Sequence, residues 1–83
     1  MNKLVYISAP WCGPCKMFGP VMNKVAESGI PVQKLDADKD HSAVMQYGVR
    51  SIPTVVKVDA NGNMIDKFVG VKNLGEIKSF YNG

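Results

Sequence analysis

The sequence is poor in the residues that would indicate a metal centre or a membrane protein. Its 83 residues include two cysteines and a single histidine, His41, so one chain offers at most three of the four ligands of a structural zinc site. No apolar run approaches the roughly 20 residues of a membrane-spanning helix, and the opening MNKLVYIS has too few apolar residues for a secretory signal. We therefore expect a cytoplasmic protein that does not contact a membrane.

A concentrated charge of one sign is also absent. Ten lysines and arginines exceed seven acidic residues by three, and the basic residues are scattered from Lys3 to Lys78 without a run or stripe. This distribution does not favour nucleic acid as the main ligand. Apolar residues make up 46% of the chain and charged residues 20%, as in an ordinary globular protein, and no repeat or linker divides it. A single domain over residues 1–83 is predicted.

Both cysteines lie in one short stretch, APWCGPCKMF, with only Gly13 and Pro14 between them. A structural disulfide from Cys12 to Cys15 would close so short a loop that the chain-entropy model gives about 2 kcal/mol. Structural zinc would need a fourth ligand, for instance from a second chain. A dithiol that cycles between thiol and disulfide is therefore the favoured interpretation.

The surrounding pattern places this pair at the start of a helix. Residues 3–7 are β-prone, apolar residues at helical spacing predict a helix over residues 12–28 that Gly29 ends, and residues 30–36 predict a second strand. The two strands should be parallel, joined by a right-handed crossover. Free amides at the helix N-terminus favour the thiolate of Cys12. Cys15, one turn deeper, is expected to be less exposed and to react second.

The remainder of the chain predicts four further elements. They are a short helix within residues 38–49 that starts at Asp40 or Ser42 and ends at Gly48, strands over 53–58 and 64–70 joined by a turn with Asn61 and Gly62, and a helix over 73–81 capped by Asn73. The methionines are expected mostly in the core.

Three separated motifs resemble the thioredoxin family: WCGPCK at residues 11–16, SIPT at 51–54 and FVG at 68–70. The resemblance implies an α/β thioredoxin fold: a four-stranded mixed sheet in the order second, first, third, fourth, flanked by three helices. The strand and helix with which longer members begin are expected to be lacking.

The resemblance also implies a set of site residues. Cys12 is expected as the nucleophile and Cys15 as the resolving thiol, with Trp11, Ile52, a cis Pro53 and Gly70 at the substrate groove. The backbone of Ile52 would pair with an extended substrate segment. Supporting roles are expected for Gly13, Pro14 and Lys34, although Lys34 could equally be a solvated strand lysine.

The implied activity is the reduction of disulfides in other proteins, by a monomer with no bound cofactor and no metal. Electrons would come from a donor like thioredoxin reductase, with glutathione as the other donor considered. The alternative function is a thioredoxin-fold binding module, or a subunit of a larger enzyme, in which the thiols are incidental.

Tyr6 departs from the family pattern, because thioredoxins usually carry a buried aspartate there, proposed to take the proton of the resolving cysteine. A phenol with a pKa of about 10 is a poor base near neutral pH. Water, Lys34 and Asp36 are the alternatives for this step.

Overall fold

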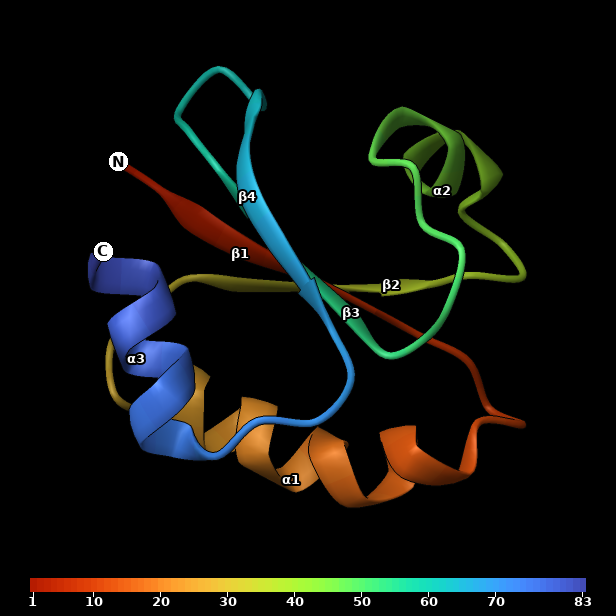
Figure 1. The fold of residues 1–83 in the computed structure, drawn as a ribbon, viewed down its shortest axis with the longest axis horizontal. Coiled ribbons are helices and arrows are strands. Elements are labelled where there is room, and N and C mark those ends of the chain that lie inside the picture. The colour runs from red at the N-terminus through yellow and green to blue at the C-terminus, as the bar shows by residue number, and fades with distance from the viewer.

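The computed structural model describes residues 1–83 as four strands and three helices (Figure 1). The elements are β1 (Lys3–Ser8), α1 (Gly13–Glu27), β2 (Val32–Asp36), α2 (His41–Gln46), β3 (Thr54–Val58), β4 (Met64–Val69) and α3 (Leu74–Asn82). β1 pairs in parallel with β2 and antiparallel with β3, which in turn pairs antiparallel with β4. The sheet is therefore mixed, and the predicted order, β2-β1-β3-β4, is confirmed.

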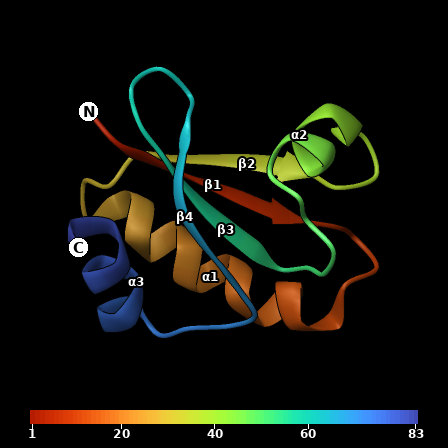
Figure 2. The ribbon, with the colours of Figure 1, turned by 45° about the horizontal axis from the view of Figure 1, so that its top comes forward.

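The helices cover the sheet unequally, with α1 and α3 on one face and α2 on the other (Figure 2). Because side chains alternate along a strand, each strand contributes to both faces. The buried residues of the first face are Leu4, Tyr6, Phe18, Met22, Val25, Ile30, Val55 and Ile77. Those of the second face are Val5, Ile7, Val56 and Val58. The larger core therefore lies under α1 and α3.

The ends of the helices follow their sequence signals. Gly29, just beyond α1, has a φ of 101° and Gly48, just beyond α2, a φ of 61°, which is the left-handed conformation that glycine adopts at low cost. Asn73 caps α3 in a capping box with Glu76, as predicted. None of the three helices combines the length and apolar character that crossing a membrane requires.

The short helix predicted within residues 38–49 is confirmed as His41–Gln46, with Asp40 at its N-cap and Gly48 just beyond its end. One expectation about the elements is wrong. The methionines are mostly not in the core. Met22 is buried, but the other four are exposed: Met1, Met17, Met45 and Met64. In α1 the inward stripe takes Phe18 and Met22, which leaves Met17 facing outward.

Candidate active site

Cys12 and Cys15 are joined by a disulfide at the beginning of α1. Cys12 is the residue that caps the helix, and its Sγ accepts a hydrogen bond from the backbone N–H of Cys15 at 3.2 Å. Gly13 and Pro14 form the exposed first turn, where the missing N–H of a proline removes no helical hydrogen bond. The backbone N–H of Cys15 therefore points toward the sulfur of Cys12, as it would toward an anion.

Both cysteines are buried in the disulfide form, in which Cys12 retains 4% of its accessible surface and Cys15 6%. The disulfide ties the two sulfurs together, and the pair packs with Ala9 and the half-buried Ile52. The relative exposure of the two free thiols and the order in which they react stay predictions.

A second segment, the loop before β3, also packs against the disulfide. Ile52 packs on the cysteine cluster, and the Ile52–Pro53 peptide bond is cis, as the resemblance implied. The Pro53 carbonyl accepts a hydrogen bond from the N–H of Gly70 at 2.9 Å, and the hydroxyl of Thr54 donates to the Ser51 carbonyl at 2.5 Å. The three motifs that are separated in the sequence are therefore adjacent in space.

Trp11 borders this region and is 67% exposed. Its indole N–H donates to Asp38 Oδ2 at 2.8 Å, which holds the ring over the loop after β2. Trp11 and Ile52 both line an open, mainly apolar pocket of about 400 Å³ whose rim includes Arg50. Sequence reasoning missed Asp38, and only its position two residues past a predicted strand end could have suggested it.

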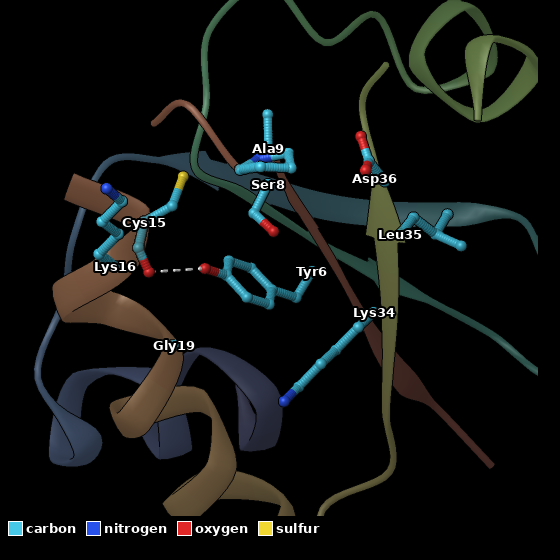
Figure 3. Close-up of a pocket in the computed structure, with 10 residues that line it drawn as sticks. Tyr6, Ser8, Ala9, Cys15, Lys16, Gly19, Lys34, Leu35 and Asp36 are labelled. Carbon is cyan, nitrogen blue, oxygen red and sulfur yellow. Dashed lines mark hydrogen bonds between the residues drawn. The ribbon is translucent and has the colours of Figure 1, made fainter. Parts of the chain in front are cut away.

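Tyr6 lies under the first turn of α1, on the face of the sheet that α1 covers (Figure 3). Its hydroxyl donates to the Cys15 carbonyl at 3.3 Å, and its ring meets Phe18 edge-on at 5.5 Å between centroids. Burial raises the pKa of Tyr6 above its ordinary value of 10.0, an effect that a hydrogen bond with the Ser8 side chain partly offsets. Tyr6 is therefore a neutral donor to the backbone of Cys15 near neutral pH.

An open pocket of about 450 Å³ separates this part of α1 from β2, and it is lined by Tyr6, Cys15, Lys34 and Asp36 among others. Lys34 is exposed, reaches from β2 toward α1, and donates a hydrogen bond to Asn23 Oδ1 (Figure 3). The Asp36 side chain points away from Cys15 and accepts the backbone N–H of Asp38 at 2.8 Å. The structure brings together no group of three or more His, Cys, Asp or Glu side chains that could hold a metal ion.

Comparison with known proteins assigns this arrangement to a family. The family model Thioredoxin matches residues 1–82. A thioredoxin of Porphyra purpurea is 38% identical over 82 residues, which cover 95% of this chain and 76% of that protein. The mitochondrial thioredoxin of Bos taurus is 36% identical over 80 residues, but the chain spans only about half of it, 48%.

Solved structures agree with the sequence relatives. A mutant thioredoxin from Halobacterium salinarum superposes with a TM-score of 0.88 at 34% identity, over 98% of this chain and 72% of that one. The fold is therefore that of known thioredoxins, and the chain belongs to the thioredoxin family.

Proposed function

We propose that this protein is a thiol-disulfide oxidoreductase that reduces disulfides in other proteins. The observation that carries the proposal is the Cys12–Cys15 disulfide at the start of α1, packed against Ile52 next to Pro53. A disulfide that closes so short a loop stabilises the fold little, whereas its place at a helix N-terminus suits a thiolate.

The reaction begins with the reduced dithiol. The Cys12 thiolate attacks one sulfur of the substrate disulfide, whose S–S bond breaks, and the released substrate thiolate takes a proton from water. Cys15 then loses its proton and attacks the Cys12 sulfur, which releases the second substrate thiolate. The substrate gains two electrons and two protons, and the chain ends as the Cys12–Cys15 disulfide. A donor like thioredoxin reductase, or glutathione, returns the electrons.

In this proposal, Cys15 releases its proton to solvent in the open pocket between α1 and β2. Lys34 is a protonated donor with no lone pair to offer, and the Asp36 carboxylate points away and already accepts an N–H. Tyr6 keeps its proton, since burial raises its pKa. Solvent is the remaining acceptor among the three considered, and the openness of the pocket supports it.

The substrate side of the site consists of Trp11, Ile52, Pro53 and Gly70, with Gly13 and Pro14 shaping the first turn of α1. Trp11 offers an exposed aromatic surface, and Ile52 a backbone beside the disulfide to which an extended segment can pair. We further propose that the protein acts as a monomer in the cytoplasm, where a reducing environment returns the dithiol to its active form.

Reduction of insulin tests this function, with dithiothreitol as the source of electrons. We expect the wild-type protein to accelerate the reaction strongly and the Cys12→Ser variant to add nothing to the rate with dithiothreitol alone. Equal rates for the wild type and the variant would instead indicate a binding module with incidental thiols. Substitution of thioredoxin reductase or glutathione for dithiothreitol then identifies the donor.

A further inference from the structure

Two lysines on neighbouring strands make the same kind of contact with different helices. Lys57, on β3, donates from Nζ to the carbonyls of Phe80 at 3.3 Å and Gly83 at 2.6 Å, at the end of α3. Lys67, on β4, donates from Nζ to the carbonyls of Tyr47 at 2.9 Å and Gly48 at 3.1 Å, at the end of α2. The last carbonyls of a helix lack helical partners and carry partial negative charge, so a lysine stabilises them.

The end of α2 depends on this contact more than the end of α3 does. α2 has six residues, none of them buried, whereas α3 has nine and buries Ile77. α2 closes with hydrogen bonds from the N–H of Gly48 to Met45 and from the N–H of Val49 to Val44. The carbonyls of Tyr47 and Gly48 then remain for Lys67, which links the end of the helix to the sheet.

The segment that follows α2 leads directly to the disulfide. It runs over residues 49–52, and Ile52 packs on the cluster of Ala9, Cys12 and Cys15. The residue after the segment is also held, because the N–H of Gly70, directly after β4, donates to the Pro53 carbonyl at 2.9 Å. The residues on both sides of the segment are therefore bonded to β4 or to the residue that follows it: Tyr47 and Gly48 to the Lys67 side chain, and Pro53 to the Gly70 backbone.

We propose that Lys67 is a positioning residue for the docking of protein substrates. By holding the end of α2 against β4, it fixes residues 49–52 so that the Ile52 backbone faces an extended substrate segment beside Cys12. The proposal rests on the proposed function. The reaction with a protein disulfide needs the backbone pairing, whereas the reaction with a small disulfide does not. Loss of Lys67 must therefore slow the first reaction more than the second.

The test compares Lys67→Met with a matched control, Lys57→Met, which removes the equivalent contact from α3. Stopped-flow measurements give the rate constant of each reduced protein with insulin and with the small aryl disulfide dithionitrobenzoate. We expect Lys67→Met to react about 5- to 10-fold more slowly with insulin and within about twofold of the wild type with the small disulfide. Lys67→Arg, which keeps a cation at this place, should restore most of the insulin rate.

Hydrogen exchange gives a readout that does not depend on activity. The amides of Gly48 and Val49 should exchange at least about tenfold faster in Lys67→Met than in the wild type, and at the wild-type rate in Lys57→Met. Unchanged exchange in Lys67→Met overturns the proposal. A loss of rate in Lys67→Met that is equal for insulin and for the small disulfide also overturns it. So does a Lys57→Met variant that loses as much of its rate with insulin, relative to the small disulfide, as Lys67→Met does. A wild-type protein that does not reduce insulin refutes the proposed function, while hydrogen exchange still decides whether Lys67 holds the segment.

Discussion

The two faces of the sheet hold their helices by different means. On the first face α1 buries three residues, Phe18, Met22 and Val25, in a continuous apolar core. On the second face α2 buries none, and its half-buried Val44 and Tyr47 are supplemented by the hydrogen bonds from Lys67. The disulfide lies at the start of α1, and the Ile52 segment follows α2. The cysteines are therefore carried by the firmly packed helix, whereas the segment that we propose to bind substrate follows the more lightly held one.

The largest effect is expected on the dithiol side of this comparison. Replacing Cys12 with serine should reduce the exchange rate to that of the reaction without protein, because only Cys12 caps α1. Replacing Cys15 with serine should leave the first attack intact and trap a covalent adduct at Cys12. Mass spectrometry after incubation with a disulfide substrate detects the adduct, and finding it only in Cys12→Ser would reverse the two roles.

Packing on the two faces can be compared directly by truncation. Phe18→Ala removes a fully buried ring that contacts Tyr6 and should lower the free energy of unfolding by about 3–5 kcal/mol. Val44→Ala, on the half-buried side of α2, should cost about 1 kcal/mol. Urea denaturation measures both losses, provided that the dependence of the unfolding free energy on urea concentration is the same as in the wild type. Similar losses for the two variants would contradict the difference drawn between the faces.

Tyr6→Asp should sharpen the comparison by placing the family's usual carboxyl under α1. The buried carboxyl lacks the partners that it had in water, so the free energy of unfolding should fall by about 2 kcal/mol or more. Resolution of the mixed disulfide should become faster near neutral pH, because an internal base is then available to Cys15. Stopped-flow kinetics against pH measure the rate, and an unchanged rate would argue against such a role for the carboxyl here.

Tyr6→Phe is the matched control, and a smaller effect is expected. Resolution should stay within about twofold of the wild type, and a loss of tenfold, equivalent to about 1.4 kcal/mol, would mean that the phenol transfers the proton. Loss of the hydrogen bond to the Cys15 carbonyl should lower the free energy of unfolding at about pH 8 by about 1 kcal/mol. Burial raises the pKa of Tyr6, so the phenol loses its proton at a lower pH in the unfolded chain than in the folded one. The difference in unfolding free energy between the wild type and Tyr6→Phe should therefore shrink as the pH rises above 10.0.

The smallest effect is expected in the β3–β4 turn, which belongs to neither helix-covered face. The Asp59 carboxylate accepts the N–H groups of Asn63 and Asn61, and these bonds hold its pKa below the usual 3.8. Asp59→Asn should lower the Tm at about pH 7 by at most a few degrees. Because the charged form is favoured in the folded state, the difference should vanish as the pH falls below 3.8. A difference that persists in acid would show that charge is not its cause.

Local signals in the sequence predicted most of the fold. Helical spacing identified the inward stripe of α1, Asn73 identified the start of α3, and Asn61 with Gly62 identified the turn of the hairpin. These features depend on backbone conformations and periodicities that neighbouring residues impose, so a short stretch suffices to recognise them. Asp40 and Gly48 likewise identified the two ends of α2.

The sequence by itself determined the dithiol, its place at a helix start and the strands on either side, since spacing and propensity along the chain are sufficient for these. Only the tertiary structure decided which groups surround the dithiol. The contacts of Trp11 with Asp38, of the Tyr6 hydroxyl with the Cys15 carbonyl and of Lys67 with the end of α2 join residues that are 9 to 27 positions apart. Such contacts depend on side-chain reach and on how the layers pack, and these are set by the whole fold and by no single stretch of it.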